Sequence, residues 1–99
     1  MNEIYERYKF NSTVQEEGES VDTLITTLRR FATSCNYGTL SGDLIQDRVV
    51  IGIRDSALRK KLQERKDLTL NFCRDTCRAS ESTSKQLSAI NQADNVHPW

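Results

Sequence analysis

Residues 20–35 read SVDTLITTLRRFATSC, and this segment organises the rest of the chain. When successive residues are turned by about 100°, its apolar side chains fall in one stripe about 120° wide. Ser20 stands where a helix N-cap is expected, and Asn36 and Gly38 tolerate the left-handed backbone that closes a helix. The segment therefore predicts an amphipathic helix whose stripe lies in a core: Val21, Leu24, Ile25, Leu28, Phe31, Ala32 and Cys35.

Upstream of this helix, the sequence predicts the end of another helix and an extended connector. Apolar residues lie at helical offsets until polar residues 11–13 end the pattern. We therefore assign residues 1–13 to a preceding helix and a linker. Gly18 then allows a tight turn before the Ser20 cap. The apolar residues of the first helix are Ile4, Tyr5, Tyr8 and Phe10.

Residues 41–54 predict a helix that is apolar on two sides, with Ser41 as its N-cap. Leu44 and Ile51 project nearly opposite to a broad apolar face, which comprises Ile45, Val49, Val50 and Ile53. Such a helix must be covered on both sides, and a domain this small has room for one modest core. We expect Leu44 and Ile51 to meet either a second chain or the N-terminal segment, through Tyr5, Tyr8 or Phe10.

The remaining sequence predicts two further helices. Asp55 or Ser56 begins a short one, and Thr69 caps the last one. The apolar stripe is lost beyond Glu81, so we expect residues 86–99 to form a frayed or disordered tail. No strand-like alternation occurs, which indicates an all-α bundle of four principal helices after the N-terminal helical segment and connector. The predicted core comprises Val21, Leu24, Ile25, Leu28, Phe31, Ile45, Val49, Ile53, Leu62, Leu70, Cys73 and Cys77.

Composition argues against several classes of function. The chain has 14 basic and 14 acidic residues, and no apolar run approaches the roughly 20 residues that a membrane span requires. Its three cysteines do not form a disulfide framework, which favours an intracellular, cytoplasmic location. The single histidine, His97, lies in the expected tail, and Cys73 and Cys77 share a core face without a CxxC spacing. We therefore expect no catalytic residue, cofactor, metal or small-molecule substrate.

Charge is unevenly distributed along the chain. Residues 1–22 carry six acidic and two basic side chains, whereas residues 23–66 carry nine basic and four acidic ones. A basic surplus attracts nucleic acid or an acidic neighbouring subunit. The alternative is a solvated helix surface, which the lack of interleaved aromatic residues favours. The candidate nucleic-acid contacts are Arg29, Arg30, Lys60, Lys61, Arg65 and Lys66.

Residues 15–30, QEEGESVDTLITTLRR, resemble the major homology region of retroviral and retrotransposon capsid proteins. The matching elements are a Gln, then Gly-Glu, then an apolar helix that ends in Leu-Arg. The order of later segments is similar to that in Gag polyproteins of gypsy-type LTR retrotransposons. These segments are CNYG at 35–38, DRVVIGIRD at 47–55, LRKKL at 58–62 and DLTL at 67–70.

The resemblance implies a capsid C-terminal domain over residues 14–85, with the major homology region at 14–30, related also to Arc and to SCAN domains. Its polar hub would comprise Gln15, Gly18, Glu19 and Arg29. Its symmetric dimer interface would comprise Leu44, Arg48 and Ile51. An alternative is a SCAN-like oligomerisation module of a transcription regulator, or a weak electrostatic RNA-binding module.

In the Gag interpretation, the partners are a second copy, the higher capsid assembly and the capsid N-terminal domain of a parent protein. The domain would act in the cytoplasm and within virus-like particles. Neither a zinc knuckle nor an aspartic protease motif occurs in the sequence. RNA would therefore be contacted through regions outside this chain.

Overall fold

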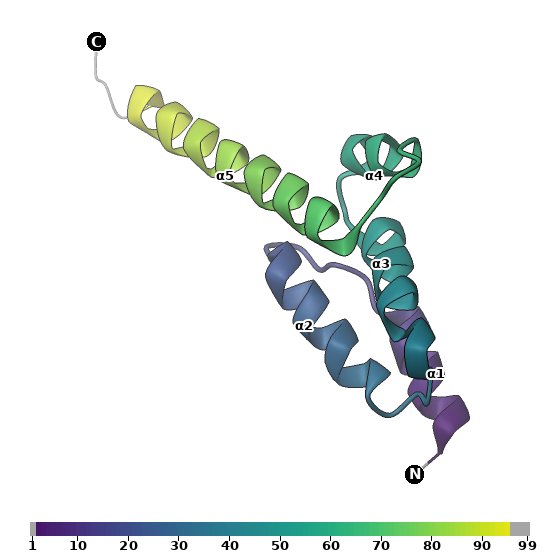
Figure 1. The fold of residues 1–99 in the computed structure, drawn as a ribbon. Helices are drawn as coiled ribbons and strands as arrows, with labels where there is room; N and C mark the ends of the chain where they lie inside the picture. The colour runs from purple at the N-terminus through teal and green to yellow at the C-terminus, as the bar shows by residue number, and fades with distance from the viewer. Residues whose placement is uncertain (1, 96–99) are drawn as a thin grey trace.

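The computed structural model describes residues 2–95, without the side chains of 88, 89 and 91–95, and contains no strand in that range. Five α-helices and one short 3₁₀ helix follow one another along the chain (Figure 1). The prediction of an all-α protein is confirmed. The elements are α1 (Glu3–Ser12), α2 (Val21–Ala32), η1 (Gly38–Leu40), α3 (Ser41–Gly52), α4 (Ser56–Gln63) and α5 (Leu70–Asn95).

Side-chain caps set the start of most helices, as the sequence predicts. The Oγ of Ser20 accepts a hydrogen bond from the backbone N–H of Thr23 at the start of α2. The carboxylate of Asp55 caps α4 by accepting from two backbone N–H groups. Thr69 accepts from the N–H of Phe72 at the start of α5. Local hydrogen-bonding chemistry thus accounts for three helix boundaries.

The start of α3 differs from the prediction. Ser41 has helical backbone angles and does not cap the helix, because η1 runs directly into α3 without an extended residue between them. Two left-handed residues precede this junction, Asn36 at φ +57° and Gly38 at φ +61°. They turn the chain between α2 and η1, as expected from their tolerance of this conformation.

The core lies where α2 packs against α1, α3 and α5. Ten of the twelve residues in the predicted core are buried, while Phe31 and Leu70 are partly buried and pack at its edge. Phe10 is only 1% exposed and makes an edge-to-face contact with the ring of Tyr37, at 5.2 Å between centroids. The buried residues that complete the core are Phe10, Ala32, Cys35 and Val50.

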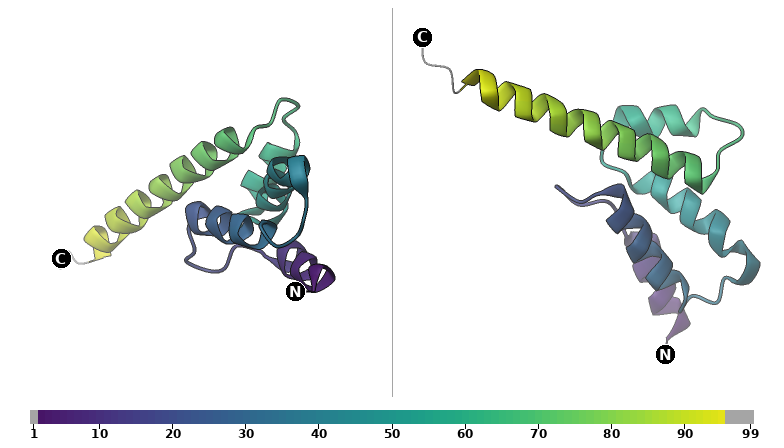
Figure 2. Two further views of the ribbon diagram at one scale, coloured as in Figure 1. Left: turned by 60° about the horizontal axis from the view of Figure 1, so that its bottom comes forward. Right: turned by 60° about the vertical axis from the view of Figure 1, so that its left-hand side comes forward.

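The last helix is longer than the sequence predicts. α5 continues to Asn95, so the frayed or disordered tail expected at 86–99 is wrong for residues 86–95, and residues 96–99, with His97, lie outside the described residues. Its C-terminal half extends away from the other helices in every view (Figures 1 and 2). Residues 82–95 contain neither Gly nor Pro, so no strong helix breaker interrupts the helix, although residues 82–87 and 90 are exposed.

Candidate functional site

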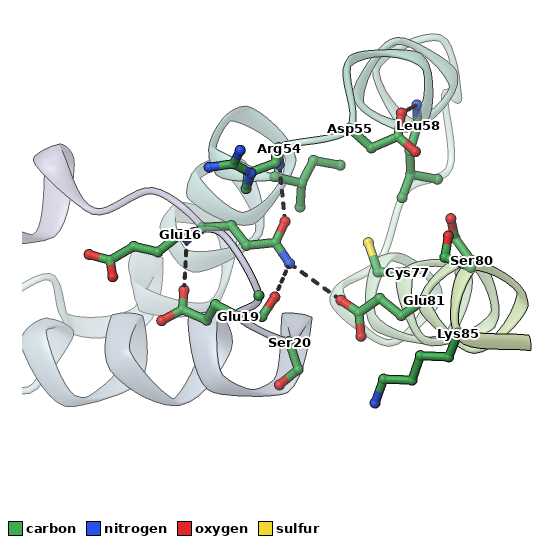
Figure 3. Close-up of a pocket in the computed structure, with 14 residues that line it drawn as sticks. Glu16, Glu19, Ser20, Arg54, Asp55, Leu58, Cys77, Ser80, Glu81 and Lys85 are labelled. Carbon is green, nitrogen blue, oxygen red and sulfur yellow. Dashed lines mark hydrogen bonds between the residues drawn. The ribbon is translucent and has the colours of Figure 1, made fainter. Parts of the chain in front are cut away.

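A polar hub centred on Gln15 joins three segments of the chain, which contain Glu19, Arg54 and Glu81, labelled in Figure 3. The Nε2 of Gln15 donates to the backbone carbonyl of Glu19 at 2.8 Å and to the Oε1 of Glu81 at 3.3 Å. Its Oε1 accepts from the backbone N–H of Arg54 at 3.0 Å. Its own backbone N–H donates to the carbonyl of Gly52 at 2.8 Å. One side chain therefore ties the turn before α2 to the end of α3 and to α5.

Glu81 is a member of this hub that the sequence analysis missed. Its Oε1 also accepts from the backbone N–H of Val21 at 2.7 Å, in the first turn of α2. A carboxylate at a helix N-terminus satisfies an N–H that has no partner within the helix and interacts favourably with the helix dipole. The two residues are 60 positions apart, so no local motif indicates this contact.

The turn before α2 depends on Gly18 and Glu19. Gly18 lies at φ +77°, a conformation that other residues rarely adopt. The carboxylate of Glu19 accepts from the backbone N–H of Glu16 at 3.3 Å, which closes the turn. Arg29, in contrast, is exposed and lies eight residues beyond Val21, about 12 Å along the helix axis. The expectation that Arg29 belongs to the hub is therefore wrong.

The hub borders a pocket of about 300 Å³ between the turn, the α3–α4 junction and α5. Its apolar lining includes Ile53, Leu58 and Cys77, and its polar lining includes Glu81 and Lys85 (Figure 3). Burial raises the pKa of the Cys77 thiol to about 12, so the thiol is protonated at neutral pH. Among the described residues, no group of three His, Cys, Asp or Glu side chains is placed to hold a metal ion.

A second candidate site is the side of α3 that faces away from the core. Leu40 is 59% exposed and Ile51 is 50% exposed, whereas Leu44 is partly buried at the core edge. Their spacing of four and seven residues places them in one stripe. Asp47 lies in the same stripe and is exposed.

Arg48 borders this stripe and contacts the connector between α1 and α2. It is partly buried, and its Nη2 donates to the backbone carbonyl of Thr13 at 3.3 Å. Its Nε is buried without a hydrogen-bond partner among the described residues. The sequence analysis expected this side of α3 to be covered either by a second chain or by the N-terminal segment. The N-terminal segment leaves Ile51 half exposed, because Phe10 packs on Tyr37 instead.

The basic residues form two separate groups. Arg29 and Arg30 are exposed at the C-terminal end of α2, which lies far from α4 in Figure 1 and in the right-hand view of Figure 2. The guanidinium of Arg65 stacks 3.8 Å from the ring centroid of Phe72. The structure thus does not bring the candidate nucleic-acid contacts together on one surface. The exposed group in and after α4 comprises Lys60, Lys61, Arg65 and Lys66.

The described helices lack any segment long and apolar enough to cross a lipid bilayer. Comparison of this chain with protein-family models, curated proteins and solved structures found no match.

Proposed function

We propose that this chain is a self-association domain of the retrotransposon Gag capsid type, which forms symmetric dimers through one side of α3. We call this side the α3 outer face and define it as Leu40, Leu44, Asp47, Arg48 and Ile51. The observation that carries the proposal is the exposure of Ile51 on α3, together with Leu40 at the end of η1 directly before it, while the other side of α3 is buried in the core. Large apolar side chains that share one exposed stripe are typical of an interaction surface.

A symmetric dimer suits this surface. In an isologous contact, the same patch of each copy faces its counterpart, and such two-fold dimers are the commonest assemblies. Two helices pack with their axes about 8–10 Å apart, which places their facing side chains in direct contact. Stable interfaces bury about 800 Å² on each partner, more than a single helix stripe supplies. We therefore expect a weak dimer in isolation, strengthened in a particle by many simultaneous contacts.

The polar hub supports this role by holding α3 in place. Gln15 bonds to backbone groups at the end of α3, namely the Gly52 carbonyl and the Arg54 N–H. Glu81 links the same amide to α5. In the proposed capsid, this bracing fixes the direction in which α3 presents its outer face. The domain then joins neighbouring capsid subunits in the cytoplasm and within a virus-like particle, while other regions of the parent protein contact RNA.

Sedimentation equilibrium of the 99-residue chain at rising concentration tests the proposal. We expect reversible dimerisation, and we expect Ile51→Asp to abolish it because the substitution places two charges in an apolar contact. Leu87→Asp is the matched control, since Leu87 is 56% exposed on α5. Circular dichroism checks that both variants keep the helical fold. A chain that stays monomeric at millimolar concentration, or one in which only Leu87→Asp disrupts the dimer, contradicts the proposal.

Electron microscopy of the intact parent protein separates the capsid interpretation from the SCAN-like alternative. Both interpretations require self-association, but only a capsid domain is expected to build closed particles. Particles that are lost in the Ile51→Asp variant support the capsid role. Dimers without particles favour a SCAN-like module.

A further inference from the structure

We propose that the two α3 helices of the dimer run parallel, along a two-fold axis, so that Arg48 of each copy forms an ion pair with Asp47 of the partner subunit. This inference rests on the proposed function, because it specifies how the α3 outer face recognises a second copy. The partner is an identical chain, which is held by apolar contacts along the middle of the interface and by opposite charges on both sides of it.

Asp47 and Arg48 lie on opposite sides of the apolar stripe of α3. Successive residues of an α-helix are turned by about 100°, so Leu44 and Ile51 point within about 20° of each other. From the line midway between these two, Asp47 is turned by about 50° in one direction and Arg48 by about 50° in the other. The α3 outer face therefore has an apolar midline, an acidic flank at Asp47 and a basic flank at Arg48.

The direction of the two-fold axis decides which flanks meet. An axis that runs along the helices makes them parallel and brings the acidic flank of each copy beside the basic flank of the other. An axis perpendicular to the helices makes them antiparallel and brings each flank beside its own copy, acidic against acidic and basic against basic. Like charges that face one another across an interface are strongly unfavourable. The charges of Asp47 and Arg48 therefore favour the parallel arrangement.

The apolar midline fits the same arrangement. When the two-fold axis runs along the helices, neither helix can slide past the other, and each residue on the midline faces its own copy. Leu44 then meets Leu44 of the partner subunit, and Ile51 meets Ile51 of the partner subunit. Asp47 and Arg48 are adjacent in sequence, so the ion-pair partners are offset by only about 1.5 Å along the axis. The apolar contacts and both ion pairs thus form together.

The two flanks also differ in shape. The acidic flank borders a hollow of about 400 Å³, whose apolar lining includes Val50, Leu62 and Leu68. The basic flank carries the connector between α1 and α2, whose Thr13 carbonyl accepts the hydrogen bond from Arg48. A parallel contact sets the connector of each copy against the hollow of the other, whereas an antiparallel contact sets hollow against hollow. The parallel arrangement therefore buries surface beyond the α3 outer face.

Both charged groups have hydrogen-bonding capacity left for this contact. The carboxylate of Asp47 is exposed and makes no hydrogen bond or ion pair to the described residues. Arg48 has five N–H donors and uses one of them, in a bond of 3.3 Å to the Thr13 carbonyl. That bond limits the rotamers of the Arg48 side chain. A charge-assisted bond to the carboxylate therefore costs less ordering entropy than a bond from a freely moving arginine would.

Charge-reversal variants of the full 99-residue chain test the parallel arrangement. Asp47→Lys and Arg48→Glu each place like charges at both flank contacts. We expect each to weaken its own homodimer at least about tenfold, measured by sedimentation equilibrium. The double variant, which carries both substitutions in one chain, restores opposite charges at both contacts. We therefore expect it to dimerise with near wild-type affinity.

The antiparallel alternative gives a different pattern. There each single reversal replaces one pair of like charges by another, so neither single variant weakens the homodimer. An equimolar mixture of the two single variants pairs opposite charges on both flanks and binds more tightly than the wild type. In the parallel arrangement, the mixture binds only as tightly as the wild type. Asp75→Lys, on the exposed surface of α5, is the control for a change of net charge alone.

Cysteine cross-linking tests the arrangement without any change of charge. In a parallel dimer, Ile51→Cys brings two thiols together on the midline, within the distance that a disulfide spans. The three native cysteines are buried. Leu87→Cys is the matched control, since Leu87 is similarly exposed on α5. At a concentration where the wild type is dimeric, we expect Ile51→Cys to form a disulfide-linked dimer under mild oxidation markedly faster than Leu87→Cys does.

The outcomes separate this inference from the proposed function. A monomeric wild-type chain contradicts both. A wild-type dimer that Ile51→Asp disrupts, but that neither single charge reversal weakens, overturns the parallel arrangement alone. A folded double variant that fails to recover also overturns it. If Arg48→Glu does not fold, Asp47→Lys and the cross-linking decide, and Ile51→Cys that cross-links no faster than Leu87→Cys overturns the arrangement.

Discussion

Arg78 of α5 and Asp22 of α2 form a two-pronged ion pair. The Nε of Arg78 lies 3.0 Å from each carboxylate oxygen of Asp22, and its Nη2 lies 2.6 Å from Oδ1. Arg78 precedes Glu81 by three residues, so both side chains leave the same face of α5. Together they hold the first turn of α2 from outside, through the carboxylate of Asp22 and the N–H of Val21.

The first prediction concerns the pH dependence of this pair. The hydrogen bond from Arg78 lowers the pKa of Asp22, so the folded chain favours the ionised carboxylate. The stability contributed by the pair is fully present above the pKa that Asp22 has in the unfolded chain, and it is lost as the pH falls through the lowered pKa of the folded chain. Because both side chains are about half exposed, we expect a small effect.

Thermal unfolding of wild type and Asp22→Asn at two pH values measures this effect. We expect the variant to be less stable than wild type at about pH 7, and we expect the difference to shrink as the pH is lowered toward about 2, because protonation of the carboxylate removes the ion pair. Asp43→Asn is the control, since Asp43 is an exposed acidic residue in the first turn of α3, as Asp22 is in the first turn of α2, and it forms no ion pair with the described residues. If Asp22→Asn is less stable than wild type by the same amount at both pH values, the ion pair is not the cause of the lower stability.

The second prediction concerns Glu81 in the hub. Glu81→Ala removes the acceptor for the Val21 N–H and for the Gln15 amide, both in partly buried hydrogen bonds. Leaving a partly buried donor without a partner costs about 1–3 kcal/mol, so we expect the free energy of unfolding in urea to fall by that amount. Glu81→Gln keeps a carbonyl acceptor, and we expect it to lose less.

Glu64→Ala provides the baseline, because Glu64 is an exposed residue at the end of α4. We expect the order of stability to be Glu64→Ala, then Glu81→Gln, then Glu81→Ala. Equal stability of the three variants would show that the hydrogen bonds of Glu81 do not stabilise the hub.

The third prediction compares two glycines that both have open space around the position of a Cβ atom. Gly18 lies at φ +77°, whereas Gly42 lies within α3. Gly18→Ala forces an L-residue into the left-handed region, and we expect a loss of about 1–2 kcal/mol in the free energy of unfolding. Gly42→Ala lowers the entropy of the unfolded chain in a helix, and we expect a gain of about 0.5–1 kcal/mol.

Urea unfolding monitored by circular dichroism measures both glycine variants under one set of conditions. The essential expectation is that the two substitutions change the free energy of unfolding in opposite directions. Neither alanine meets a steric obstacle, so backbone conformation alone distinguishes the two positions. A stabilising Gly18→Ala variant would contradict the left-handed turn that the hub requires.

The parts of the fold that the sequence predicts are those governed by neighbours along the chain. The α2 stripe and the Ser20, Asp55 and Thr69 caps depend on residues within about one or two turns. The tail was predicted incorrectly because an apolar stripe reports burial rather than helicity. In the second half of α5 the backbone is helical, while residues 83–87 and 90 are exposed.

The parts that could not be predicted depend on contacts between distant segments. Glu81 reaches Val21 across 60 positions, and Phe10 is buried against Tyr37 although its own helix is mostly exposed. Arg29 was placed in the hub through the resemblance, but the length of α2 separates it from Gln15. The resemblance thus pointed to Gln15, Gly18 and Glu19, whereas Glu81 could be identified only from the coordinates.

The late position of Glu81 has a consequence for synthesis of the protein. While a ribosome is still translating α4, the nascent chain contains α2 but lacks the carboxylate that completes its first turn. The earlier helices then have their local caps but no closed hub. The hub therefore closes only after Glu81 of α5 has left the exit tunnel.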